Sequence, residues 1–326
     1  MLSAFIKKLF GPKKVDLKLL SHYLIKCAKA NSYVETLGKS ADSLHIYVKD
    51  GYEVDFKREF EREVGLAIKK LRIVYAEIAF DITYEPFYGK TRNLHIINTS
   101  TDKKYGGTFQ FLTCSLINKG MSIPLMVLPV RLGSQTKLVV ELVDYCKHLF
   151  KNRIKCCLFD RGFYIAELID FLGSKKINYL IFTPKHGDIL KKYIEETEDL
   201  SVNIHQMKYS KNKSCWKPKT NIVVCKNIDG FNWLFATNMK FDTALDYVKK
   251  YKRRWQIETN YRVQDEARIK SKSTHYMIRY FYFLVSSILH VYWIIHKKHE
   301  YYVQFKKFID EIEQKTLFKY LKITTM

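Results

Sequence analysis

The sequence predicts an α/β protein with an open sheet whose strands are joined by crossover helices. Short apolar, β-rich runs recur along the first half of the chain, at 73–82, 109–117, 123–130, 154–159 and 177–183. Stretches with helical periodicity lie between the later runs, at 134–150 and 163–172. The order is therefore strand, hairpin, helix, strand, helix, strand, which is typical of a sheet with crossover helices.

The composition indicates a polyanionic partner. The chain has 326 residues, of which 47% are hydrophobic, so it can bury a sizeable core. Lysine and arginine number 56 against 33 acidic residues, and the formal net charge is +23. Such a charge favours binding to a polyanion through the release of counterions. It does not distinguish DNA from RNA or from an anionic membrane.

The cysteines and the amino-terminal residues bear on the cellular compartment. The seven cysteines include no C-x2-C pair, and Cys156 and Cys157 lie in an apolar run that is typical of a core. These features predict a reducing cytosol. Lys7 and Lys8 interrupt the first apolar stretch, so no signal peptide is expected.

One apolar run, 280–295, is long enough to raise the question of a membrane span. It reads YFYFLVSSILHVYWII and contains His290. Its length of about 16 residues falls short of the roughly 20 that cross a bilayer. The sequence therefore predicts a buried helix, and no membrane partner is expected.

Two aspartates are expected at the ends of strands. Asp81 lies near the end of the run 73–82, and Asp160 directly follows the run 154–159. Ligand sites in open α/β sheets lie beyond the carboxyl ends of strands. An aspartate in such a place also serves often as a turn former or a helix cap, which is the alternative for each residue alone.

The segment 251–265, YKRRWQIETNYRVQD, has no glycine or proline and is predicted to be helical. Steps of three and four residues place Tyr251, Arg254, Glu258 and Arg262 on one side, together with Tyr261. Trp255 lies about 100° round from Arg254 and is expected to face a core. The alternative is a solvated amphipathic helix with ordinary surface ion pairs.

Glu258 completes a set of three carboxylates if its helix packs over the strand ends. Asp81, Asp160 and Glu258 would then hold two Mg²⁺ or Mn²⁺ ions about 3.5–4 Å apart. Such a pair of ions is used for in-line phosphoryl transfer, and arginine forks suit phosphate.

Three blocks of the sequence resemble the DDE transposases of bacterial and archaeal insertion sequences, in the insertion-sequence-four group. They are FDITYEPFYGK around Asp81, DRGFY from Asp160, and the spacing Y-x2-R-x3-E at Tyr251, Arg254 and Glu258. The family signature ends with a lysine seven residues after the glutamate. Asp265 occupies that position here, and Lys270 and Lys272 lie further on.

The resemblance implies an RNase H-like catalytic core, a mixed sheet with flanking helices. It divides the chain into a helical region at 1–72, core at 73–184, a β-rich insertion at 185–240, closing core helices at 241–300 and a helical tail at 301–326. The first region is expected either to bind DNA ends or to pack against the core. The basic loop of the insertion, with Lys211, Lys213, Lys217 and Lys219, is expected to face DNA.

The resemblance also implies a function and a set of site residues. The expected protein is a transposase of a prokaryotic cytoplasm, associated with the nucleoid. It would cut at transposon inverted-repeat ends and join the freed 3′ ends to target DNA, as a homodimer on double-stranded DNA. Asp81, Asp160 and Glu258 are the implied metal ligands. The expected DNA contacts are Tyr251, Arg254, Arg262, Lys270, Lys272, Arg161 and Trp216.

Two other functions stay open at this point. One is a non-enzymatic DNA-binding protein derived from the same fold, which the departure at Asp265 leaves room for. The other is a metal-dependent nuclease that cuts DNA without strand transfer. Two roles also stay open for Trp216. Its ring either stacks on a flipped base of the DNA or serves as an ordinary anchor of its loop.

Overall fold

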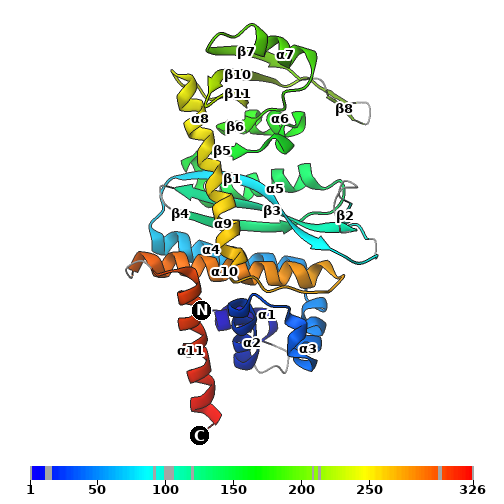
Figure 1. The fold of residues 1–326 in the computed structure, drawn as a ribbon, viewed down its shortest axis with the longest axis vertical. Helices are drawn as coiled ribbons and strands as arrows, with labels where there is room; N and C mark the ends of the chain where they lie inside the picture. The colour runs from blue at the N-terminus through cyan, green and yellow to red at the C-terminus, as the bar shows by residue number, and fades with distance from the viewer. Residues whose placement is uncertain are drawn as a thin grey trace.

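The computed structural model describes residues 2–11, 17–90, 93–98, 106–118, 121–207, 209–211, 214–299 and 303–324. A mixed sheet of nine strands forms the centre of this part of the chain, and its strands succeed one another along the long axis of the molecule (Figure 1). The strands are β1 (Ala76–Phe87), β2 (Ile96–Ile97), β3 (Gly107–Asn118), β4 (Met121–Pro129), β5 (Ile154–Phe159), β6 (Tyr179–Phe182), β7 (Leu200–Gln206), β10 (Lys219–Ile228) and β11 (Phe231–Thr237). A separate two-stranded hairpin joins β8 (Tyr209–Lys211) to β9 (Ser214–Trp216).

The strand order is β2-β3-β1-β5-β6-β11-β10-β7, and β4 also pairs with β3. β1, β3 and β4 are antiparallel, whereas β5 runs parallel to β1 and β6 runs parallel to β5. From β6 onward, β11, β10 and β7 are antiparallel to their neighbours. The predicted α/β architecture, a mixed sheet with flanking helices, is confirmed.

Apart from the β8–β9 hairpin, the strands of the region 185–240 join the central sheet. β11 pairs with β6 through Phe235 and Phe182, so β11, β10 and β7 extend the central sheet. This region also contains the helix α7 (Asp188–Glu195), which the sequence analysis did not predict. Strand pairing between distant segments leaves no local pattern, which is why the strands were predicted and their place in the sheet was not.

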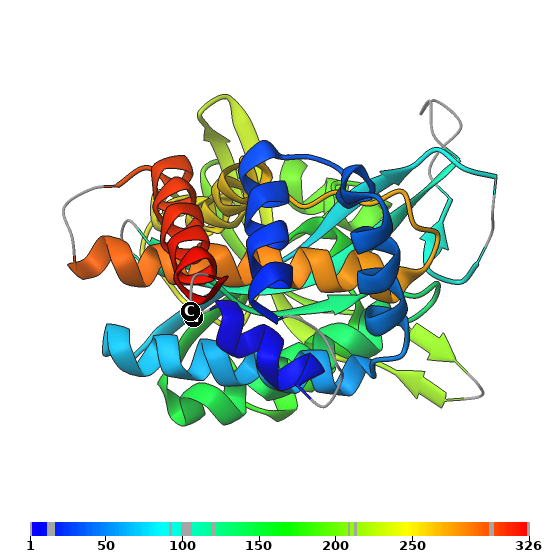
Figure 2. The same cartoon turned by 90° about the horizontal axis from the view of Figure 1, so that it is seen from below.

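The helices cover both faces of the sheet and one end of the molecule (Figures 1 and 2). The amino-terminal ones are α1 (Leu2–Phe10), α2 (Leu17–Ala30), η1 (Val34–Leu37), α3 (Lys39–Lys49) and α4 (Glu53–Leu71). Those between the strands are α5 (Gln135–Phe150), η2 (Lys151–Arg153), η3 (Arg161–Phe163) and α6 (Ala166–Ser174). The closing ones are α8 (Ala244–Lys252), η4 (Arg253–Trp255), α9 (Gln256–Asp265), α10 (Tyr276–His299) and α11 (Phe305–Thr324).

α10 is the buried helix that the sequence predicts. By length and composition its residues 276–298 pass the test for a membrane span, but the most apolar part of this stretch is wholly buried inside the protein. It packs against α4, β4 and α3. The helices α1, α2 and α11 lie on its far side, away from the sheet (Figure 1).

β1 is longer than predicted. It continues past Ile82 through Pro86, which pairs with Thr108 of β3. β5 accompanies β1 only as far as Phe80, so the later half of β1 has one open side, where a strand tolerates proline. Asp81 therefore lies in the middle of β1 and not near its end.

The starts of two predicted helices differ in their capping. Ser134 does not cap α5, because its hydroxyl exchanges hydrogen bonds with the backbone of Arg131 instead. Thr243 does cap α8: its Oγ1 accepts a hydrogen bond from the backbone N of Asp246 at 3.2 Å. This cap fixes where the closing helices leave the sheet.

Candidate active site

Asp81 and Asp160 lie at adjacent positions of two neighbouring strands. Ala79 of β1 pairs with Leu158 of β5, and Phe80 pairs with Phe159, so the next register position on the two chains is Asp81 beside Asp160. Parallel neighbours are about 4.8 Å apart. Both aspartates thus lie where β5 ends and the two neighbouring segments of the chain begin to diverge.

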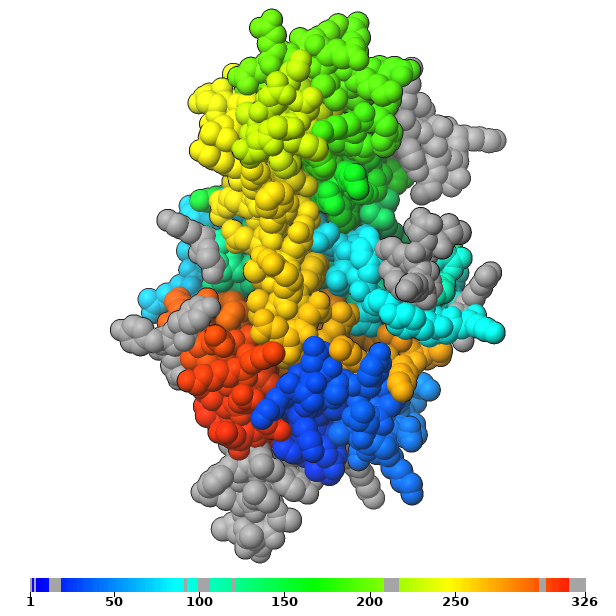
Figure 3. Space-filling model, viewed as in Figure 1, coloured from blue at the N-terminus to red at the C-terminus, as the bar shows by residue number. Residues whose placement is uncertain are grey.

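α8, η4 and α9 form a continuous strap across the face of the sheet that carries these aspartates (Figure 1). Tyr251 is in α8, Arg254 is in the 3-10 turn η4, and Glu258 is in α9. The predicted single helix is therefore broken by a tighter turn at its arginine. The space-filling view shows the strap, in yellow, accessible along the front of the molecule (Figure 3).

The turn places Arg254 inward and Trp255 outward, so the prediction that Trp255 faces a core is wrong. Arg254 is 5% exposed and Trp255 is 47% exposed. A buried guanidinium needs counter-charges, and the inward position supplies them. Its Nη1 lies 3.6 Å from Oδ1 of Asp81, and its Nη2 lies 2.7 Å from Oε1 of Glu258.

Burial raises the pKa of the Asp81 carboxyl to about 6, and the negative charges of Asp160 and Glu258 add to this rise. The guanidinium of Arg254 and the backbone N–H of Ile82 oppose it. Three carboxylates from three elements therefore share one electrostatic environment, and one arginine provides the cation among them.

Asp160 is held by two hydrogen bonds. Its Oδ1 accepts from the backbone N of Arg161 at 2.7 Å and from the phenol of Tyr251 at 3.4 Å. The Tyr251 ring is buried against Phe182, Trp233 and other rings of the sheet, and this burial raises the pKa of its phenol. Tyr251 is thus a neutral donor that orients Asp160.

The three carboxylates suit a hard divalent cation, because such cations prefer carboxylate oxygens as ligands. A cation would also stabilise the negative charge of Asp81, which burial disfavours. Within the described ranges, however, no three His, Cys, Asp or Glu side chains lie close enough together to hold a metal ion. The guanidinium of Arg254 lies beside Asp81 and Glu258 instead. The carboxylates are thus suitable ligands for the predicted Mg²⁺ or Mn²⁺. A metal site made of Asp81, Asp160 and Glu258 requires the guanidinium of Arg254 to move away from Asp81 and Glu258.

A cavity of about 270 Å³ opens beside Asp160. Its other lining residues are Phe182, Phe231, Trp233, Tyr251, Arg254 and Trp255. Lys185 lies over the Phe231 ring with its Nζ 3.2 Å from the ring centre, and burial lowers the pKa of this lysine. The sequence analysis named Tyr251 but missed Phe182, Phe231 and Trp233 as site candidates, although the alternating Phe231 and Trp233 of β11 were a usable signal.

The remaining predicted DNA contacts are dispersed. Arg161 and Arg262 are exposed, and Arg262 donates to the hydroxyl of Thr259 at 3.2 Å rather than joining the carboxylates. Lys270 is half-buried and Lys272 is exposed, in the segment after α9. Trp216 ends β9, but its side chain lies outside the described residues, as do Lys213 and the side chain of Lys211.

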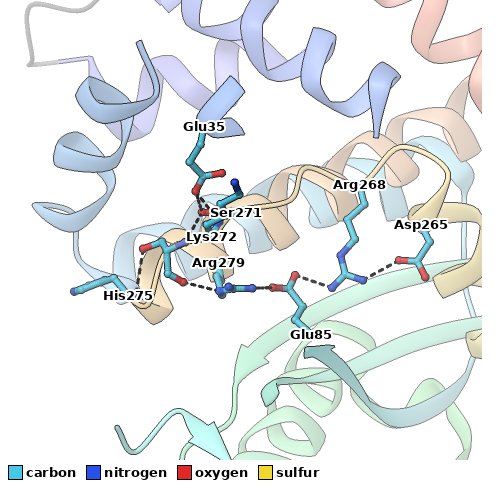
Figure 4. Close-up of polar contacts among 9 residues, drawn as sticks. Glu35, Glu85, Asp265, Arg268, Ser271, Lys272, His275 and Arg279 are labelled. Atoms are coloured by element: carbon cyan, nitrogen blue, oxygen red, sulfur yellow. Dashed lines mark hydrogen bonds and ion pairs between the residues drawn. The ribbon is translucent and has the colours of Figure 1, made fainter. Parts of the chain in front are cut away.

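Asp265, at the position of the family lysine, pairs with an arginine one helical turn on. Its Oδ1 lies 3.0 Å from Nη1 of Arg268, whose Nη2 lies 2.7 Å from Oε1 of Glu85 (Figure 4). Glu85 is buried in β1 and also pairs with Arg279 of α10 at 3.1 Å. Neither Glu85 nor the two arginines was predicted as part of a network.

Comparisons with known proteins agree with this fold. A cryo-EM structure of the piggyBac transposase synaptic complex with hairpin DNA has a TM-score of 0.62 to this chain. The match covers 96% of this chain and 77% of that one at 11% sequence identity, a level at which the likeness concerns the fold. A search of curated proteins gave no match. The family model described as the transposase DDE domain matches residues 98–292, more than half of the sequence, and the chain therefore belongs to the DDE transposase family.

Proposed function

We propose that the protein is the transposase of an insertion sequence of the insertion-sequence-four group. It would cleave DNA at the transposon ends and transfer the freed strands into target DNA by in-line phosphoryl transfer. The proposal combines the family membership with the three sequence blocks that resemble that group. The partners would be inverted-repeat ends and target duplex, bound by a homodimer in a prokaryotic cytoplasm.

One observation carries the proposal for the site: the carboxylates of β1, of the end of β5 and of α9 all surround Arg254. Arg254 pairs with Asp81 and Glu258, and its charge also acts on Asp160 through space. An ordinary surface helix does not bury its arginine among acids from two separate strands. We assign Asp81, Asp160 and Glu258 as the metal ligands, for two Mg²⁺ or Mn²⁺ ions.

Bound divalent ions would supply Lewis-acid stabilisation of the charge that develops on the transferring phosphoryl group. The chain's own residues do the rest. Arg254, displaced from the carboxylates, offers its guanidinium fork to a phosphate beside them. The Tyr251 phenol donates to Asp160 and fixes the direction of that carboxylate.

The aromatic cavity beside Asp160 suits a base next to the cleaved bond. Trp255 and Phe231 are 47% and 40% exposed at its mouth. Stacking of a base on such a ring contributes about 1–3 kcal/mol. The basic side chains of Lys185 and Lys252 lie over rings of the same wall and favour the adjoining phosphates.

The helical region at 1–72 is proposed to contact the DNA ends and to pack against the core. It is joined to the segment after α9 by two backbone hydrogen bonds. The N of Val34 donates to Lys270 O at 2.9 Å, and the N of Lys270 donates to Ser32 O at 3.0 Å. A DNA contact in that region would thus be transmitted to the strap that carries Glu258, through these two hydrogen bonds and the segment after α9.

The test is incubation of the purified protein with Mg²⁺ and a duplex made from the inverted repeat that borders the gene. Nicked, hairpin and joined products are separated on denaturing gels. Joined products support the transposase, whereas cleavage without joining indicates a metal-dependent nuclease. Binding without either product indicates a DNA-binding protein of the same fold and contradicts the proposal.

A further inference from the structure

A second pocket lies on the same side of the molecule as the carboxylates. It has a volume of about 420 Å³ and is formed between the end of β1 and the segment that joins α9 to α10. Its lining includes Tyr33, Tyr88, Lys270 and Lys272, with Glu85 and the two arginines Arg268 and Arg279. The volume is within the range of pockets that bind molecules the size of a nucleotide.

The walls of this pocket are held by ion pairs. Glu85 holds Arg268 at 2.7 Å and Arg279 at 3.1 Å, and Arg279 also donates from Nε to the backbone O of Ser273 at 2.7 Å (Figure 4). Glu35 lies behind the pocket, and its Oε1 accepts from the Ser271 hydroxyl at 2.7 Å. The segment that carries the two pocket lysines is therefore fixed in place.

The positive charge of the pocket is only partly balanced. Glu35, whose Oε1 also accepts from the backbone N of Lys272 at 2.6 Å, is a third acid beside four basic side chains. The two arginines are matched by Glu85 and Asp265. Among the described residues, no carboxylate pairs with the ammonium of Lys270 or Lys272, and Lys272 lies 5.5 Å from the centre of the Tyr33 ring. Two lysines beside exposed tyrosine rings present a cationic and aromatic surface, which is the chemistry that recognises a nucleotide unit.

The location relates this pocket to the proposed cleavage site. Asp81 and Glu85 share one face of β1, since they are four residues apart, which corresponds to about 13 Å. A DNA strand advances about 3.4 Å along its axis per nucleotide. A strand cut beside Asp81 would reach the pocket about four nucleotides away.

We propose that this pocket binds one phosphate and its nucleotide of the transposon-end DNA, about four nucleotides from the cleaved bond. Lys270 and Lys272 bind the phosphate, and Tyr33 and Tyr88 flank the nucleotide. The inference rests on the proposed function, because the occupant is the same DNA. It adds a subsite that fixes the register of the strand.

The experiment is a phosphate scan without metal, so that binding is read separately from cleavage. The probe is the duplex of the bordering inverted repeat, in which one linkage at a time is replaced by an uncharged methylphosphonate. We compare the wild type with Lys270→Ala/Lys272→Ala and with the control Lys306→Ala/Lys307→Ala, which removes the same charge from exposed positions of α11. Thermal unfolding of each protein checks the fold, and Lys270→Gln/Lys272→Gln is a second pair.

One neutral linkage, three to five nucleotides from the cut, is expected to weaken binding about tenfold in the wild type and in the control. The same linkage should have little further effect in the pocket variant. The slope of log affinity against log salt should fall by about 1 in that variant. Both effects are the loss of the same phosphate contact.

Equal sensitivity of all proteins to that linkage would overturn the proposal. Failure of the pocket and failure of the proposed function give different results. A scan that identifies the phosphate in a protein that never cuts DNA supports the pocket and contradicts the transposase. Cleavage without the position-specific effect contradicts the pocket and supports the transposase.

Discussion

Asp81 and Glu85 lie four residues apart on one face of β1, and each meets an arginine from the segment on either side of α9. Arg254 precedes α9 and faces Asp81 at 3.6 Å, whereas Arg268 follows it and meets Glu85 at 2.7 Å. Glu77, four residues earlier on the same strand, pairs with Arg253 at 2.6 Å and with Lys250 at 2.7 Å. A row of regularly spaced acids on β1 thus fixes the strap and the segment after it to the sheet.

The first prediction concerns Arg254. Arg254→Met keeps most of the side-chain volume but leaves the half-buried Asp81 without its cation, so the free energy of unfolding should fall by about 3 kcal/mol. Arg253→Met is the control with a smaller loss, because Glu77 keeps Lys250. Urea unfolding measures both. Millimolar Mg²⁺ should restore more stability to Arg254→Met than to the wild type, since a metal replaces the lost cation. No Mg²⁺ effect in either protein would count against a metal site here.

The second prediction separates catalysis from binding at Asp160. The amide oxygen of Asp160→Asn still accepts the hydrogen bonds from Arg161 N and the Tyr251 phenol, so the fold should persist. Loss of a ligand charge should depress strand cleavage by orders of magnitude, because about 1.4 kcal/mol is a factor of ten. Affinity for end DNA without metal should stay the same or rise slightly. Cleavage at the wild-type rate would make Asp160 a structural residue.

The third prediction concerns the buried carboxylate Glu85. Glu85→Gln leaves Arg268 and Arg279 without their shared counter-charge, and stability should fall by about 3 kcal/mol. Asp265→Asn is the matched control, since Asp265 pairs with the same Arg268 from a side chain that is 58% exposed. Its effect should be under about 1 kcal/mol. Equal losses in chemical denaturation would show that burial of Glu85 has no special role.

The fourth prediction concerns pH. Burial lowers the pKa of His290 to about 3, well below its ordinary value of 6.5. Its surroundings are uncharged: Gln264 lies 3.5 Å from Nδ1, and the rings of Trp293 and Phe305 pack against it. Between pH 6.5 and 3, His290 therefore binds a proton in the unfolded chain but not in the folded chain. Stability is complete above pH 6.5 and is lost as the pH falls through that window.

The variant His290→Gln removes this contribution. Between pH 7.5 and 4.5 the wild type should lose about 2–3 kcal/mol more than the variant, at about 1.4 kcal/mol per pH unit. Urea midpoints at the two pH values measure the difference. Parallel pH profiles for the two proteins would mean that the buried imidazole does not titrate in the unfolded chain as assumed.

The strands and the neighbouring aspartates were accessible to sequence reasoning because their signals are local. β5 begins and ends where its apolar run predicts, and Asp160 follows it directly. The inward position of Arg254 was not accessible, because helical spacing places Trp255 and Arg254 on different sides but does not say which side is buried. The acid of the sheet that pairs with it, Asp81, lies far away in the chain.

The unbroken sheet gives the molecule a fixed unit of length. From β1 to β7 there are five inter-strand steps in the order β1-β5-β6-β11-β10-β7, which amount to about 24 Å. Because hydrogen-bonded strands do not slide past one another, the β7 end of the sheet stays at a fixed distance from the carboxylates beside β1 and β5.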